Sequence, residues 1–76
     1  MRGVKNMLPL TLAKPGEINT IVRVGGNAET RKRLEDLGFH PGGTVQIISE
    51  INGNLIVNVK ETRVAIDRAL AFRIGI

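Results

Sequence analysis

The chain contains no cysteine, tryptophan or tyrosine among its 76 residues. Without cysteine, disulfide bridges and thiolate zinc sites are excluded, and a reducing compartment is indicated. Phe39 and Phe72 are the only aromatic residues. This shortage argues against a surface that stacks single-stranded nucleic acid and excludes an aromatic groove for proline-rich peptides. Both rings are expected to lie in the core.

Long apolar runs are also missing. No run approaches the roughly 20 residues that a bilayer-spanning helix needs, and the N-terminus lacks the apolar region of a signal peptide. These absences predict a cytoplasmic protein. Residues 7–76 are expected to form one small domain that buries roughly 60% of its unfolded surface, and the polar residues 1–6 are expected to form a flexible tail. The formal net charge of +4 favours an anionic partner.

Candidate catalytic and metal-binding residues are few. His40 is the only histidine, so a transition-metal site would have to be built from carboxylates around it. It lies beside Pro41 in a predicted turn, where a solvated histidine is the more common situation. The two Gly-Gly pairs lack the Lys-Ser/Thr of a phosphate-binding loop, and turn formation explains both. The sequence therefore predicts no catalytic residue, no metal ligand and no cofactor.

One stretch predicts a helix over residues 28–37. Asn27 is a good N-cap, because its side chain can accept a hydrogen bond from the first turn. Gly38 follows where a helix needs a left-handed residue to end. Phe39 and Leu34 would then make the apolar contact that accompanies a Schellman ending. So short a helix is not stable alone in water and must pack on the rest of the chain.

The residues around the predicted helix end have a structural and a functional interpretation. Leu37 shares the apolar face of the helix, and together with Phe39 it forms an apolar tip that can dock a partner. Capping contacts are the more common explanation of such a tip. Pro41 and Gly42 predict a turn that leads into the next strand. We therefore interpret these residues as structural.

A basic cluster, Arg31, Lys32 and Arg33, lies on the predicted helix. It can form an electropositive face for an acidic protein, an anionic lipid or nucleic acid. It can also be a solvated helix face that neighbouring carboxylates partly neutralise, with Glu29 and Arg33 at ion-pair spacing. Both interpretations stay open from the residues alone. Four further arginines can lie near this cluster on the folded chain: Arg23, Arg63, Arg68 and Arg73.

Short β-rich segments surround the helix. The alternation of leucines in residues 7–12 predicts an edge or first strand, since it contains a proline. Residues 17–24 predict another strand, with Ile18, Val22 and Val24 on one face. Residues 44–51 and 55–60 predict a hairpin, because Asn52-Gly53 suits a type I′ turn between them.

The C-terminal part continues this pattern. Glu61-Thr62 is a short connection to a strand at residues 63–66, and Asp67 can cap a single helical turn. Residues 72–76 predict a last strand that pairs either with the chain's own barrel or with a second copy. The predicted fold is thus mostly β, a small barrel of about five short strands with one inserted α-helix.

Four stretches in order carry a resemblance to a known family. They are LTLAKPGE at residues 10–17, RLEDLGFHPGGTV at 33–45, the hairpin at 45–59 and RVAIDRALAFRI at 63–74. From residue 7 to its end the chain resembles the ferrous iron transport protein A (FeoA) family. The resemblance implies an SH3-like barrel and a non-enzymatic accessory role in bacterial ferrous iron uptake. It also implies a cytosolic partner surface for the membrane transporter FeoB, and recruitment to the inner face of the membrane.

Other functions remain compatible with the residues. A small nucleic-acid-binding barrel would use the same basic residues and lose affinity steeply as salt rises. A regulatory module like the C-terminal barrel of iron-dependent repressors is a relation of fold, because the chain shows no helix-turn-helix. The missing cysteine and single histidine count against a free-standing metal sensor. The sequence favours a partner-binding adaptor, with the basic cluster as the contact and weak self-association left open.

Overall fold

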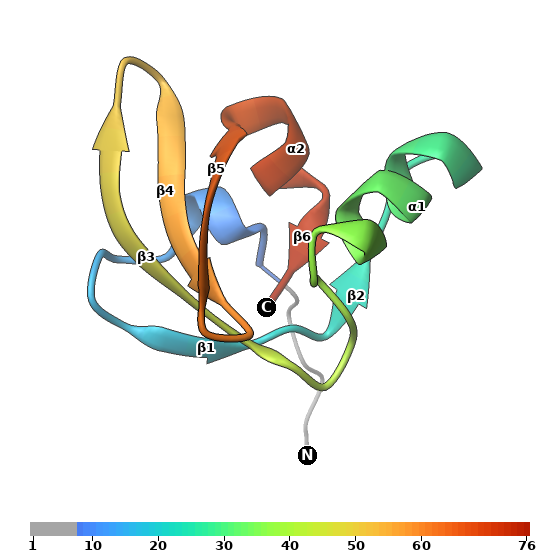
Figure 1. Cartoon of the computed structure of the whole chain (residues 1–76), viewed down its shortest axis with the longest axis horizontal. Helices are drawn as coiled ribbons and strands as arrows, with labels where there is room; N and C mark the ends of the chain where they lie inside the picture. The colour runs from blue at the N-terminus through green and yellow to red at the C-terminus, as the bar shows by residue number, and fades with distance from the viewer. Residues whose placement is uncertain (1–7) are drawn as a thin grey trace.

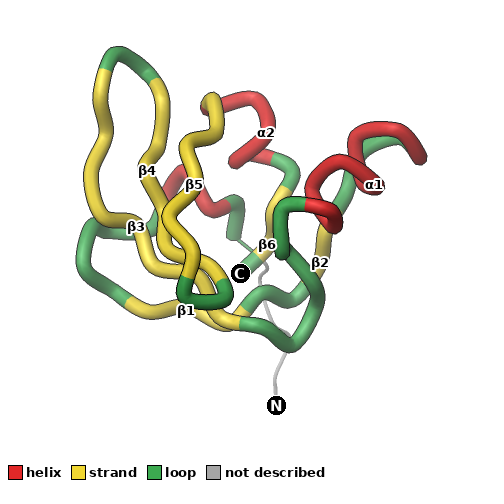
Figure 2. Tube along the Cα trace, in the orientation of Figure 1, coloured by secondary structure: helices red, strands yellow, loops and turns green. Residues whose placement is uncertain are grey.

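The computed structural model describes residues 8–76, so the expected tail at residues 1–6 lies outside the described part. Within the described residues the chain forms six strands, two α-helices and one 3-10 turn (Figures 1 and 2). In chain order these are η1 (Leu10–Leu12), β1 (Ile18–Thr20), β2 (Arg23–Val24), α1 (Ala28–Asp36), β3 (Thr44–Ile51), β4 (Asn54–Val59), β5 (Thr62–Asp67), α2 (Arg68–Phe72) and β6 (Ile74–Gly75).

The strands form two antiparallel sheets. Four of them lie in the order β1-β3-β4-β5, and β2 pairs separately with β6. In Figure 1 the β3–β4 hairpin stands on one side of the molecule, and α1 lies beside β2 on the opposite side. The predicted mostly β fold with one inserted α-helix is confirmed.

One core lies between the sheets and helices. Thirteen buried side chains form it, and no polar side chain among the described residues is buried with them. Strand β4 contributes the alternating set that its sequence predicts. The core residues are Leu10, Ile21, Val24, Leu34, Phe39, Val45, Ile47, Leu55, Val57, Val59, Ile66, Ala71 and Ile74.

Two tight turns join the strands of the larger sheet. Asn52 and Gly53 have φ values of 52° and 82°, which confirms the predicted turn with two left-handed residues. The turn between β4 and β5 consists of Lys60 and Glu61, with φ values of 50° and 62°. The predicted connection at residues 61–62 is therefore displaced by one residue, since Thr62 already belongs to β5.

Both ends of α1 are as the sequence predicts. The Asn27 Oδ1 atom accepts a hydrogen bond from the Thr30 N–H at 2.8 Å. At the other end, Gly38 has a φ of 111° and follows the C-cap residue. The Phe39 N–H donates to the Leu34 carbonyl at 3.0 Å, as in a Schellman ending. Because Leu34 and Phe39 are fully buried, this ending fixes α1 to the core, and the ring of Phe39 is not available as a docking tip.

We expect Asn27→Ala to lower the free energy of unfolding by about 1 kcal/mol, because the Thr30 N–H loses its acceptor. Urea denaturation followed by circular dichroism measures this loss. Asn27→Asp is the matched control, since a carboxylate also accepts from the first turn and suits the helix N-terminus. An alanine variant as stable as the aspartate variant would contradict a capping role.

The prediction of a strand at residues 7–12 is wrong. Pro9 forms only an isolated bridge with Gly75, and the chain then turns into η1. Within this turn the Ala13 N–H donates to the Leu10 carbonyl at 3.0 Å. A 3-10 turn has a three-residue period, so only one of the three alternating leucines faces the core. Leu10 is fully buried, whereas Leu8 and Leu12 are 48% and 63% exposed.

The strand predicted at residues 17–24 is split between the two sheets. The Ile21 N–H donates to the Gly43 carbonyl at 2.7 Å, and the Val22 N–H donates to the Gly75 carbonyl at 2.8 Å. The chain therefore passes from the larger sheet to the smaller one at Ile21 and Val22. The regular alternation between inward-facing and outward-facing residues is interrupted there. Ile21 is buried, whereas Ile18 and Val22, predicted on the same face as the buried Val24, are exposed.

The predicted role of Phe72 is also wrong. Asp67 caps a helix as expected, its Oδ1 accepting from the Leu70 N–H at 2.8 Å, but this helix extends to Phe72. The Phe72 ring is 60% exposed and does not belong to the core. The last strand, β6, pairs with the chain's own β2, which settles the alternative left open for these residues.

Candidate partner-binding surface

The basic cluster of α1 lies on the surface. Leu34 is the only buried residue of this helix, and the side chains of Arg31, Lys32 and Arg33 are exposed. Lys32 Nζ lies 3.5 Å from Asp36 Oδ2, and both side chains are so exposed that the pair contributes little. No ion pair is seen between Glu29 and Arg33 within residues 8–76, nor any involving Arg31. Two guanidinium groups of the cluster thus face solvent without a carboxylate partner from the described chain.

The other four arginines do not gather around α1 as one group. Arg68 Nη1 lies 3.1 Å from Glu50 Oε2, so this guanidinium already has a partner. Arg63 lies on β5, opposite Asn58 in the larger sheet. Arg23 and Arg73, by contrast, come together at the smaller sheet, one on β2 and the other just before β6.

The register of β2 and β6 places Arg23 opposite a glycine and brings Arg73 close to another. Arg23 is the direct partner of Gly75, and the Gly25 N–H donates to the Arg73 carbonyl at 2.8 Å. Directly opposed residues, and residues two apart on one strand, share a face of an antiparallel sheet. Arg23 and Gly75 therefore share one face of this sheet, whereas Arg73 is the C-cap of α2, with a helical φ of -80° and ψ of -9°, and directly precedes β6.

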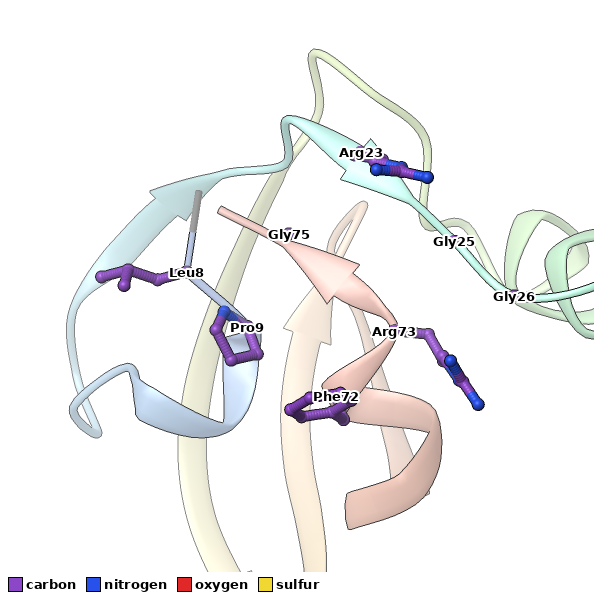
Figure 3. Close-up of a pocket in the computed structure, with 8 residues that line it drawn as sticks. All are labelled: Leu8, Pro9, Arg23, Gly25, Gly26, Phe72, Arg73 and Gly75. Carbon is purple, nitrogen blue, oxygen red and sulfur yellow. The ribbon is translucent and has the colours of Figure 1, made fainter. Parts of the chain in front are cut away.

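Apolar side chains lie next to these arginines, on the other side of β6. Pro9 bridges to Gly75, and Leu8 forms reciprocal backbone hydrogen bonds with Ile76, so this segment borders β6 on the side away from β2. Figure 3 shows Leu8, Pro9 and Phe72 on one side of β6, and Arg23 and Arg73 toward the other. Here lies a hollow of about 290 Å³, which we call the Arg23–Arg73 trough. It is lined by Leu8, Pro9, Arg23, Gly25, Gly26, Phe72, Arg73 and Gly75.

The trough adjoins the N-terminal end of α1. A Cβ atom placed on Gly26 would lie 3.0 Å from Thr30 Cγ2 and 3.8 Å from Arg73 Cδ. The Cδ atom of Arg73 therefore lies close to Gly26, two residues before α1 begins. The trough therefore borders the start of α1, the helix that carries the basic cluster.

The sequence held one signal for the trough that its first interpretation missed. Arg23-Val24-Gly25 and Arg73-Ile74-Gly75 repeat the same pattern of an arginine, a β-branched residue and a glycine. The two tripeptides meet in antiparallel register around the Val24–Ile74 pair, which places Arg23 opposite Gly75 and joins Gly25 to Arg73 through a backbone hydrogen bond. The apolar residue between them faces the core in both.

The remaining candidate groups do not form a site. His40 lies in the turn before β3, where its carbonyl accepts from the Gly43 N–H at 3.0 Å. Among residues 8–76, no three side chains of the types His, Cys, Asp and Glu come together as metal ligands. The helices of this part are also too short or too polar to cross a membrane.

Comparison with known proteins agrees with the sequence resemblance. The family model described as the FeoA domain matches residues 8–76. A protein from Methanocaldococcus jannaschii, named as a candidate Fe(2+) transport protein A, is 32% identical over 68 residues, which cover 90% of this chain and 83% of the relative. The crystal structure of an iron uptake regulatory protein called FeoA has 31% identity and a TM-score of 0.83, covering 93% of this chain and 95% of that one.

A further solved structure identifies the fold class. FeoA of Stenotrophomonas maltophilia, in complex with zinc, is 25% identical with a TM-score of 0.77, covering 88% of this chain and 86% of that one. That protein is described as a prokaryotic SH3 domain protein and a candidate activating factor of ferrous iron transport. The barrel described above is therefore SH3-like, as expected. The chain belongs to the FeoA family, whose members are associated with ferrous iron transport.

Proposed function

We propose that the protein is a non-enzymatic adaptor of ferrous iron uptake that binds the cytosolic part of the transporter FeoB and modulates it. The observation that carries this proposal is the FeoA family match over residues 8–76. Its site of action would be the cytosolic side of the membrane, to which the transporter recruits it. The single domain, residues 7–76, is sufficient for binding in this proposal.

The basic cluster of α1 supports a contact with an acidic surface. Arg31 and Arg33 are exposed and have no ion-pair partner among the described residues, so their charges are free to meet an acidic partner. Opposite charges across an interface accelerate encounter and fix orientation, and both effects weaken with salt. We assign Arg31, Lys32 and Arg33 to the contact with FeoB.

The double variant Arg31→Glu, Arg33→Glu should bind the cytosolic region of FeoB about tenfold more weakly and with less dependence on salt, while remaining folded. Titration of the ¹⁵N-labelled protein with that region, followed by NMR, measures affinity and maps the contact at once. The matched control is Lys14→Glu, Arg63→Glu, which changes the net charge equally at two exposed residues outside α1.

The outcomes separate the contact from the function. Full affinity in the α1 double variant would remove the basic cluster from the interface and leave FeoB binding intact. Absence of any saturable shift with wild-type protein would contradict the adaptor function itself. A parallel titration with duplex DNA tests the alternative of a nucleic-acid-binding barrel, which requires shifts with DNA that disappear steeply as salt rises.

A further inference from the structure

The charges of the Arg23–Arg73 trough are unbalanced. Arg23 and Arg73 are both exposed, both line the trough, and neither forms an ion pair with residues 8–76. Two positive charges that line one hollow repel each other, so this arrangement does not help the chain to fold. An anionic group between the two guanidinium groups would remove the repulsion and accept hydrogen bonds from both.

The glycines keep the space between the arginines open. Gly75 lies directly across from Arg23, and the Gly25 N–H donates to the Arg73 carbonyl at 2.8 Å. A side chain at either glycine would project from the same face and fill the room that a ligand needs. The hollow is therefore lined by two guanidinium groups and by bare glycine backbone, and a guanidinium group binds a carboxylate through two parallel hydrogen bonds.

The other end of the trough is apolar and exposed. Phe72 is 60% exposed and Leu8 48%, and Pro9, which bridges to Gly75, lines the same end of the hollow. A phenylalanine that is mostly exposed contributes little to folding, whereas aromatic and arginine side chains are enriched where partner proteins bind. The apolar group next to the basic pair has no counterpart on an inorganic anion, so both ends together fit a protein segment better than a phosphate.

We propose that the Arg23–Arg73 trough is the docking site for a short linear segment of a partner protein that carries a carboxylate next to an apolar side chain. The carboxylate lies between Arg23 and Arg73, and the apolar side chain packs against Leu8, Pro9 and Phe72. The hollow of about 290 Å³ has room for about two side chains, which limits the segment to a short motif.

The N-terminal residues 1–7 of the chain itself do not have the chemistry of this occupant. Residues 1–7 contain two cationic side chains, Arg2 and Lys5, and no carboxylate. They cannot neutralise the basic end of the trough. The inference deepens the proposed function and rests on it, because the acidic segment would belong to the same partner that contacts the neighbouring basic cluster on α1.

A direct test uses a capped peptide of alternating leucine and glutamate, titrated into the ¹⁵N-labelled protein. We expect saturable NMR shifts at the backbone amides of Gly25, Gly26, Arg73 and Gly75. Arg23→Gln and Arg73→Gln should each weaken the affinity about tenfold, and Phe72→Ala should weaken it without changing the fold. Arg63→Gln is the matched control, since it makes the same chemical change on β5.

Three results would overturn the inference: no saturable shift at millimolar peptide, equal affinity for a peptide with glutamine in place of glutamate, or equal affinity in the arginine variants. Inorganic phosphate that displaces the peptide at equal concentration would show a simple anion site instead. Shifts on dilution of the free protein, confined to the trough, would indicate that a second copy occupies it.

The same variants separate this inference from the proposed function. If the cytosolic region of FeoB binds the double variant Arg23→Gln, Arg73→Gln with full affinity, the docking site is wrong and the adaptor function stands. If the peptide binds in the trough while FeoB does not bind at all, the proposed function fails and the docking site stands.

Discussion

Phe39→Ala is expected to lower the free energy of unfolding by about 3–5 kcal/mol. The Phe39 side chain is fully buried and is the largest of those that are. Its backbone N–H also closes the end of α1 on the Leu34 carbonyl at 3.0 Å, so the ring packs where the helix joins the barrel. Truncation leaves a cavity at that junction, and urea denaturation measures the loss.

The size of this loss matters because the domain is small. A chain of this length has a total free energy of unfolding of about 4–11 kcal/mol, so the alanine variant would retain little or none of it. The chain offers a matched control in its other phenylalanine, which is 60% exposed. Phe72→Ala should change the stability by less than about 0.5 kcal/mol. Similar losses in the two variants would contradict the assignment of one ring to the core and the other to the surface.

Local features of the fold could be predicted from the sequence because neighbouring residues decide them. Asn27 caps α1 through a residue three positions away, and Gly38 ends the helix through its own backbone. Asn52 and Gly53 form their turn because both tolerate a left-handed conformation. In each case the interacting groups lie within a few residues of one another, so the tertiary structure has little influence on the outcome.

The wrong predictions concern segments whose faces are decided by distant partners. Alternating leucines before residue 13 fit the two-residue period of a strand, but only the isolated Pro9–Gly75 bridge forms, and Leu10–Leu12 adopt a 3-10 turn. Ile21 became an inward position because its backbone bonds to Gly43 and the next residue bonds to β6. Periodicity alone does not reveal where a short strand changes sheets.

The candidate partner-binding surface also has one part that the sequence predicts and one part that depends on the tertiary structure. Arg31, Lys32 and Arg33 are consecutive, so their common position on one helix follows from the sequence alone. The Arg23–Arg73 trough depends on the register between two short strands from opposite ends of the chain. Its apolar end further depends on Phe72 leaving the core, which follows from the length of α2. Both features depend on tertiary structure, and the repeated tripeptide is their only signal in the sequence.

Gly38→Val is expected to cost about 2–3 kcal/mol, for a reason that differs from cavity formation. The φ of Gly38 is 111°, a conformation in which a β-branched residue is strongly strained. Space is not the obstacle, because a Cβ atom here would meet Lys60 Cδ at 3.7 Å and Val59 Cγ1 at 3.8 Å, which are ordinary contacts.

The backbone origin of this cost is testable with a second variant. Gly38→Ala adds only the Cβ atom and should cost about 1–2 kcal/mol, with the remainder in Gly38→Val coming from its branched side chain. Thermal and urea unfolding of the two variants measure the series. The loss should come mainly from the end of α1, so the hydrogen exchange of the Phe39 N–H, which bonds to Leu34, should accelerate in both. A valine variant as stable as the parent protein would mean that the helix does not end at Gly38, and the geometry that fixes α1 and its basic cluster to the barrel would have to be reassigned.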